Sequence, residues 1–268
     1  LPRLSSRSRF ARIPFFRGVM VLGESLSLGF RALSWSAIKA GGEEEGEEVK
    51  GIHIAGAMVV ALVLFIGIFM LLPLFVARGV ERLWGESVVL FNVVDGVVRV
   101  LLFVGYIWAI GRSKDIKRVF EFHGAEHKTI HAYEAGDPLT LEAIQRYSPR
   151  HPRCGTNFLL IVILIAIVVF TAVGRPSLLW LVLSRIFLIP VIAGLAYELL
   201  KVAASTSWLA FLSRPGIWLQ RLTTAEPAAD QVEVAVASLL VALDETERRA
   251  VEERGPVLPG ALAYEGGV

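Results

Sequence analysis

Long apolar runs alternate with shorter polar segments along most of the chain. Four uncharged or nearly uncharged runs cover residues 54–76, 88–110, 156–173 and 178–200. At a rise of about 1.5 Å per residue, helices of this length approach or exceed the thickness of a hydrocarbon core of about 30 Å. The last two runs are separated only by residues 174–177, a link short enough for an antiparallel hairpin. The pattern predicts an all-α membrane protein with four transmembrane helices.

The segments outside the four runs have weaker patterns. A basic amphipathic stretch begins the chain, and an acidic linker follows it. Near the end, apolar residues recur with helical period from Asp230, where Asp230 and Glu233 suggest a capping box. We therefore expect this order: a membrane-associated segment, 1–40; the linker, 41–51; two spans, 52–110; a polar helical loop, 111–155; two spans, 156–200; an interfacial segment and amphipathic helix, 201–254; a disordered tail, 255–268.

Composition supports a membrane protein. Hydrophobic residues make up 54% of the 268, and the mean hydropathy is +0.60, well above the values of soluble globular proteins. The net charge is only +2, but eight basic residues gather in the loop 111–155. The positive-inside rule then places this loop and both termini in the cytoplasm. The partner expected from these features is the lipid bilayer, and none of them points to nucleic acid.

The loop 111–155 also carries the candidate chemistry. His123, His127 and His131 are spaced by four residues and share one face of a helix predicted over 115–135. Glu126 precedes His127, so the stretch reads His-x-x-Glu-His, the inverted zinc-protease motif. Glu134, eleven residues after His123, returns to nearly the same face. A divalent metal, zinc above all, is the cofactor that this pattern suggests.

Two metal sites are compatible with the sequence. In a catalytic site, His123 and His127 bind the metal, Glu198 from the fourth run is the third ligand, and Glu126 is the general base. In a structural site, the same two histidines join His151 and Cys154, which lie in a second polar cluster with Arg153. Alternatively, these histidines are ordinary loop residues that interact with lipid phosphate or neighbouring glutamates.

Charged residues also interrupt the apolar runs. Asp95 and Arg99 are four residues apart and are expected to pair, which lowers the cost of placing them in a membrane. Arg185 and Glu198 lie in the fourth run, either as functional groups or as a plain charge pair. These few groups offer little for a transport pathway. The single cysteine, Cys154, excludes an internal disulfide.

Several motifs together resemble the YqhQ-like family of bacterial membrane proteins. They are IPFFRG at 13–18, FEFHGAEHKTIHAYE at 120–134, HPRCG at 151–155, PGIWLQ at 215–220, LTTAEP at 222–227 and QVEVA at 231–235. The resemblance implies a plasma-membrane protein whose His-rich loop is the family's hallmark, and it brings no settled activity. Family members usually begin with a glycine-rich segment before the first motif, and this chain starts after it.

The function that we expect is a metal site at the cytoplasmic membrane surface, with metal-dependent hydrolysis or proteolysis as its extension. Its ligands come from His123, His127, Glu198, His151 and Cys154, and the neighbouring residues are His131, Glu134, Arg153 and Arg185. The competing expectation is a non-enzymatic membrane scaffold or a homo-oligomeric assembly subunit.

Overall fold

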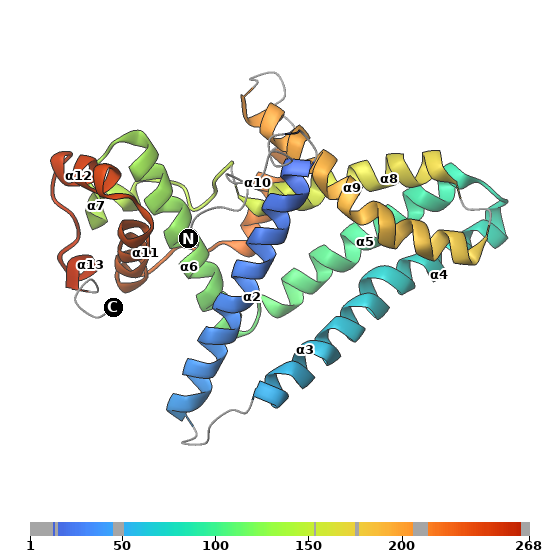
Figure 1. Ribbon diagram of the computed structural model, residues 1–268, viewed down its shortest axis with the longest axis horizontal. Helices are drawn as coiled ribbons and strands as arrows, with labels where there is room; N and C mark the ends of the chain where they lie inside the picture. The colour runs from blue at the N-terminus through green and yellow to red at the C-terminus, as the bar shows by residue number, and fades with distance from the viewer. Residues whose placement is uncertain are drawn as a thin grey trace. The chain divides into compact units, whose positions relative to one another are not determined.

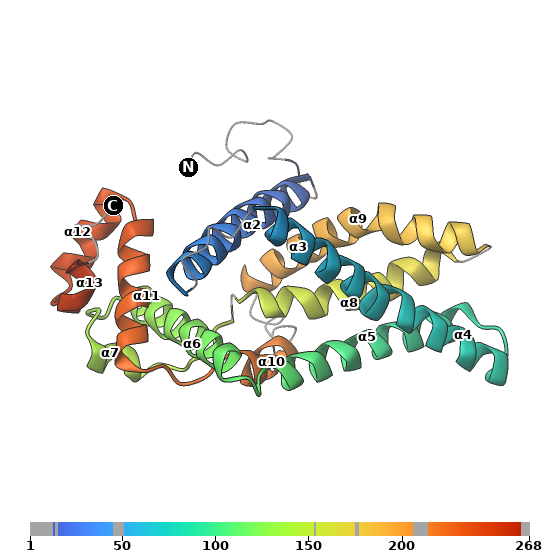
Figure 2. The same ribbon diagram turned by 90° about the horizontal axis from the view of Figure 1, so that it is seen from below.

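The computed structural model describes residue 13 and residues 16–44, 51–152, 154–174, 177–205 and 214–263, and every regular element within them is helical. The chain forms two compact units (Figures 1 and 2). The membrane unit comprises Leu1–Phe103 and Phe158–Leu209, and the polar unit comprises Val104–Asn157 and Ala210–Val268. The chain passes from one unit to the other within α5 and within α8, which are defined below.

The membrane unit consists of long apolar helices. They are α2 (Phe16–Glu44), α3 (Gly51–Phe65) with the π-helical η2 (Ile66–Leu71) and α4 (Leu72–Trp84), α5 (Val88–Ile110), α8 (Gly155–Val173) and α9 (Leu178–Ser205). Among the described residues, three stretches are long and apolar enough to cross a membrane: Gly56–Trp84, Val88–Ile110 and Leu179–Val202. Phe158–Val173 is apolar but shorter. The prediction of an all-helical membrane protein is confirmed, with three candidate spans rather than an established four.

The first span is one rod built from α3, η2 and α4 (Figure 1). Its π-helical turn precedes Pro73, which has no N–H to donate and whose ring crowds the carbonyl four residues earlier. The backbone widens there, and the N–H of Leu72 bonds to the carbonyl of Gly67, five residues back. The rod therefore stays continuous through the proline.

Close packing joins the ends of helices that are distant in sequence. Gly18 of α2 lies against α9, where an added Cβ would be 3.0 Å from the carbonyl oxygen of Gly194. Beside it, the Arg17 guanidinium and the Glu198 carboxylate form a two-point ion pair at 2.6 and 3.2 Å. Glu198 therefore pairs with Arg17 and not with Arg185. A charge pair between Glu198 and Arg185 was one of the two alternatives that the sequence left open. The N-terminal end of α2 is fixed to α9 by this pair.

Two segment boundaries differ from those expected. Helix α2 continues to Glu44 and so includes the first four residues of the stretch 41–51 that was expected to be a linker. The helix expected from Asp230 begins at Ala229. Its first turn is closed by Gln231, whose side-chain oxygen accepts from the N–H of Ala228, rather than by Glu233.

In its described residues the polar unit contains the helices α6 (Lys114–Ala135), α7 (Leu141–Gln145), α10 (Arg214–Thr223), α11 (Ala229–Ala242), α12 (Glu245–Glu253) and α13 (Pro259–Ala263). Helices α6 and α11 lie side by side at its centre. The core between the helices contains Ala125, Ala132, Leu139, Ile144, Val232, Val236, Leu240 and Val251. Burial of this apolar surface stabilises the unit and holds α6 in place.

The tail expected to be disordered from residue 255 instead packs on this core through residue 263. Ala261 of α13 is fully buried in it. The N–H of Leu258 donates to the carbonyl of Leu139 at 3.1 Å. Residues 264–268 lie outside the described part of the chain.

Candidate metal centre

Helix α6 carries the histidines, and its bounds agree with the predicted helix over 115–135. It ends where Gly136 adopts a left-handed conformation, φ 81°, which glycine tolerates best. Its buried face packs on α11 and on the chain between α7 and α8. The four-residue spacing therefore directs His123 and His127 toward one neighbouring segment, the stretch 149–154.

Three potential ligand atoms meet between α6 and that segment. One atom each from His123, His127 and Cys154 lies within 4.8 Å of the other two. The Nε2 of His123 is 3.4 Å from the Sγ of Cys154. His127 is buried, whereas His123 and Cys154 are partly exposed. The three groups form a compact set of two nitrogens and one sulfur, and two of the three residues are partly open to solvent.

Backbone carbonyls fix both imidazole rings. The Nδ1 of His123 donates to the carbonyl of Thr223 at 2.8 Å, and that of His127 donates to the carbonyl of Pro149 at 2.7 Å. Because a carbonyl only accepts, each Nδ1 carries a proton, and each Nε2 is the nitrogen available to a metal. Partners of this kind orient the histidine ligands of known metal sites.

The segment 149–154 is itself held at several points. The Gln220 side chain donates to the carbonyl of His151 at 2.8 Å and accepts from its N–H at 2.7 Å. His131, one turn beyond His127, bonds through Nε2 to the carbonyl of Arg150 at 2.9 Å. Gln220 is completely buried, so these bonds are shielded from water. The chain is therefore fixed at Arg150 and His151, a few residues before Cys154.

A close backbone approach explains the glycine between the two histidines. A Cβ on Gly124 would lie 2.0 Å from the carbonyl oxygen of Ala225. The N–H of Ala225 donates to the carbonyl of Phe120 at 2.9 Å. The stretch that includes Thr223 thus crosses α6 directly over Gly124. Only glycine admits this approach, and the approach places the Thr223 carbonyl against His123.

The Cys154 thiol and the His123 imidazole each shift the pKa of the other. Burial by itself would raise the pKa of Cys154, but hydrogen bonds from His123, His127 and Thr156 lower that pKa to about 5. Burial would lower the pKa of His123, but its bonds to Cys154 and to the Thr223 carbonyl raise it above its usual value. At neutral pH the pair therefore favours a thiolate beside an imidazolium. A thiolate is the form of cysteine that binds metals.

His151 has different neighbours from those expected in the structural site. Its ring lies 4.3 Å from that of His131, measured between centroids, and 5.9 Å from that of His127. Its Nε2 is 3.4 Å from the Glu134 carboxylate. Burial, together with the charges of His131 and His127, lowers the pKa of His151, which favours a neutral ring. His131, His151 and Glu134 form a second polar group beside the three-ligand set.

The other predicted residues lie elsewhere. Glu126 is exposed on α6 next to His127. Glu198 belongs to the membrane unit and is paired with Arg17, so its role as a ligand stays a prediction. Arg185, also in the membrane unit, contacts Asp95. Arg153 lies outside the described residues.

Sequence reasoning missed the groups that hold the ligands. Gln220, the Thr223 carbonyl and the Pro149 carbonyl all orient the set. Gln220 and Thr223 lie within the motifs at 215–220 and 222–227, which carried the resemblance, but no chemistry was assigned to them. A sequence does not show which backbone carbonyls will accept hydrogen bonds from side chains. The glycine of the motif at 120–134, in contrast, is a sequence signal that another backbone segment passes close to the helix.

These observations define an all-helical membrane protein with a candidate His₂Cys centre in its polar unit. The chain belongs to the family described as "Protein of unknown function (DUF1385)", whose model matches residues 13–245. It is 34% identical over 242 residues to "Uncharacterized protein YqhQ" of Bacillus subtilis (strain 168), a match that covers 85% of this chain and 76% of the relative. The resemblance seen in the motifs is thereby confirmed. No solved structure matches the chain.

Proposed function

We propose that this chain is a membrane metalloprotein in which His123, His127 and Cys154 bind a divalent ion of the zinc type. The observation that carries the proposal is the convergence of the three ligand atoms within 4.8 Å. Zn–N bonds of about 2.0 Å and a Zn–S bond of about 2.3 Å at a tetrahedral angle imply an N···S separation of about 3.5 Å. The separation between His123 Nε2 and Cys154 Sγ is 3.4 Å, so little rearrangement is required.

The ligand chemistry supports the same proposal. Zinc prefers nitrogen and sulfur ligands, and a thiolate binds it better than a thiol. The lowered pKa of Cys154 provides the thiolate at neutral pH. The two carbonyl contacts leave both Nε2 atoms facing the sulfur side of the set. A bound ion would replace the proton that His123 and Cys154 share.

Three protein ligands leave a fourth position open, which is typical of catalytic rather than structural zinc. Two of the three ligand residues are partly exposed, and Glu126 lies exposed one residue before His127. We therefore favour an enzyme that hydrolyses its substrate, with Glu126 as the general base. In that role Glu126 holds or moves a proton at its carboxylate.

The centre belongs at the cytoplasmic surface of the plasma membrane in this proposal. Cys154 immediately precedes α8, whose apolar part Phe158–Val173 we propose as a fourth span, paired with α9 as a hairpin. The eight basic residues of the loop 111–155 support a cytoplasmic position for the loop and for both termini. Cys154 is thus four residues before the first residue of this proposed span.

Metal analysis of purified protein tests the proposal. We expect wild-type protein to retain stoichiometric zinc, and His127→Ala and Cys154→Ser to lose it. Lys114→Ala is the control, because Lys114 is exposed near the start of the same helix and lies outside the three-ligand set. Equal trace metal in all four proteins would overturn the proposal and favour a scaffold or an oligomeric assembly subunit.

A second candidate is a cysteine nucleophile, which the pairing of Cys154 with His123 favours. His123 is oriented by the Thr223 carbonyl, as the base of such a pair must be. Hydrolysis of an ester reporter separates the two candidates. A metalloenzyme loses hydrolysis when chelated and recovers it with zinc, whereas a cysteine enzyme keeps it under chelation and loses it on alkylation of Cys154.

A further inference from the structure

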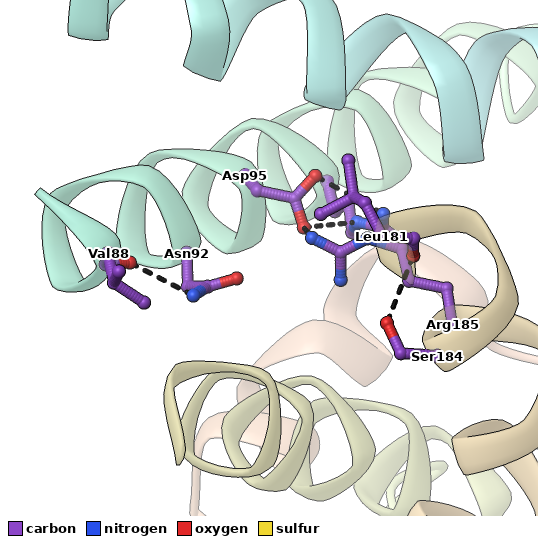
Figure 3. A network of polar contacts seen from close by, with 7 residues as sticks. Val88, Asn92, Asp95, Leu181, Ser184 and Arg185 are labelled. Atoms are coloured by element: carbon purple, nitrogen blue, oxygen red, sulfur yellow. Dashed lines mark hydrogen bonds and ion pairs between the residues drawn. The ribbon is translucent and has the colours of Figure 1, made fainter. Parts of the chain in front are cut away.

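A polar stripe on α5 faces inward in the membrane unit. Asn92, Asp95 and Arg99 lie three and four residues apart, which places them on one side of the helix. Asn92 and Asp95 are buried, with 3% and 4% of their surface exposed. Across from them, α9 presents Ser184 and Arg185, which are also buried (Figure 3). Polar groups buried in a membrane span are costly and for that reason suggest a function.

One carboxylate in this cluster serves two guanidinium groups. Arg99 donates to both oxygens of Asp95, each at 3.2 Å. The Nη2 of Arg185 lies 3.2 Å from one of the same oxygens. Two positive charges and one negative charge leave a surplus of one positive charge among these three residues. In a membrane interior an uncompensated charge costs several kcal/mol.

Most of the hydrogen-bonding capacity of Arg185 is unused. The side chain is 2% exposed, and apart from the ion pair of Nη2 with Asp95 its three nitrogens make no hydrogen bond within the described residues. The ring of Phe170, on α8, lies 4.2 Å from the guanidinium carbon and covers one face. A guanidinium has five N–H donors, so the site lacks acceptors as well as negative charge.

The nearby polar side chains bond within their own helices. The Asn92 amide donates to the carbonyl of Val88 at 2.9 Å, and the Ser184 hydroxyl donates to the carbonyl of Leu181 at 3.1 Å. Figure 3 shows both bonds running along their helices rather than toward Arg185. These donors therefore do not relieve the shortage of acceptors.

We propose that Arg185 and Arg99 form the binding site for an oxyanion of the carboxylate or phosphate class, between α5 and α9. Such an anion supplies both the charge and the planar pair of acceptors that a guanidinium fork binds best. The site is separate from the candidate metal centre and does not depend on it. Asp95 keeps Arg99 and Arg185 together and sets the surplus charge at one.

The depth of the cluster in the membrane is compatible with two sources of this anion. Asp95 is the eighth residue of α5 and Arg185 the eighth of α9, so each lies about 10 Å along its helix from the first residue. That depth is short of the midplane of a hydrocarbon core about 30 Å thick. A soluble oxyanion and the phosphate of a lipid headgroup are both within reach of a long arginine side chain at such a depth.

Binding measurements on delipidated protein in neutral detergent test the soluble source. We expect inorganic phosphate or acetate to raise the melting temperature of wild-type protein, and Arg185→Gln to weaken the binding by about tenfold or more. Arg99→Gln should weaken it similarly, because Asp95 then neutralises Arg185. Arg31→Gln, on the exposed part of α2, is the control and should bind as wild type does.

Native mass spectrometry tests the lipid source. Protein placed in mixed phosphatidylglycerol and phosphatidylcholine vesicles and then extracted should retain phosphatidylglycerol, and Arg185→Gln and Arg99→Gln should lose it. If Arg185→Gln fails to fold, Arg99→Gln alone carries the test. The proposal is overturned if wild-type protein binds phosphate, acetate and phosphatidylglycerol no more tightly than the two variants do. The cluster then only holds α5 against α9.

Discussion

Replacing Gly124 by alanine should damage the candidate metal centre without removing any ligand. The new Cβ would lie 2.0 Å from the carbonyl oxygen of Ala225. Ordinary C···O contacts are about 3.3 Å or longer, so α6 and the crossing segment must separate by about 1.3 Å. Thr223, whose carbonyl orients His123, is two residues before Ala225. Overpacking of this kind costs about 1–3 kcal/mol of stability, and loss of a ligand's orienting partner weakens metal binding by about 10–100-fold.

Competition with a chromophoric chelator measures the zinc affinity of the variant. Gly105→Ala is the matched control, because Gly105 is a helical glycine of the polar unit whose added Cβ would meet nothing within 4 Å. Alanine is favoured over glycine in a helix by about 1 kcal/mol, so this control should bind zinc normally and unfold no more easily. Wild-type zinc affinity in Gly124→Ala, with unchanged stability, would refute the reasoning about the crossing segment.

Three further predictions concern the centre. In metal-free protein the alkylation rate of Cys154 should rise with pH around pH 5, the pKa of its thiol, and stay level at higher pH, because only the thiolate reacts. His123→Ala removes a hydrogen bond that lowers this pKa, so the midpoint of the rate profile should move to higher pH. Added zinc should block the reaction. Gln220→Ala leaves the N–H of His151 without its acceptor, whereas the carbonyl of His151 keeps the N–H of Cys154 as a donor. The change should cost about 1–3 kcal/mol of unfolding free energy and speed hydrogen exchange at the His151 amide; unchanged exchange there would contradict the role given to Gln220. Glu198→Gln should leave the zinc content unchanged, because the carboxylate is engaged by Arg17, and loss of zinc would instead make Glu198 a ligand.

The helices of this chain follow from local pattern. Apolar runs predict the long helices, because the backbone of a spanning segment must satisfy its own hydrogen bonds in lipid. The helix carrying His123 and His127 was predicted to within one residue at its start, since its four-residue spacing and Gly136 are local signals. The packing of residues 255–263, which belong to the stretch expected to be disordered, does not follow from local pattern, because it depends on Leu139, more than a hundred residues away.

The candidate centre could be predicted only in part. His123, His127 and Cys154 were all singled out from ligand type and spacing, but so were His151 and Glu198, which make other contacts. A sequence shows which residues can bind a metal and not which ones converge, because convergence depends on the path of the segment 149–154. The pairing of Asp95 with Arg99 was foreseen from their spacing.

Tertiary contacts also decided the partners of the charges in the spans. Arg185 and Glu198 are thirteen residues apart on α9, about 20 Å along a straight helix. Each finds a partner on another helix, Asp95 on α5 and Arg17 on α2. The spacing of residues along the chain does not predict these ion-pair partners.

X-ray absorption spectroscopy of the zinc-loaded protein tests the central claim most directly. The convergence of His123, His127 and Cys154 predicts one sulfur at about 2.3 Å and two imidazole nitrogens at about 2.0–2.1 Å, together with one further light atom. Cys154→Ser should remove the sulfur contribution. A zinc spectrum without sulfur in wild-type protein, or protein that cannot be loaded with zinc, would contradict it.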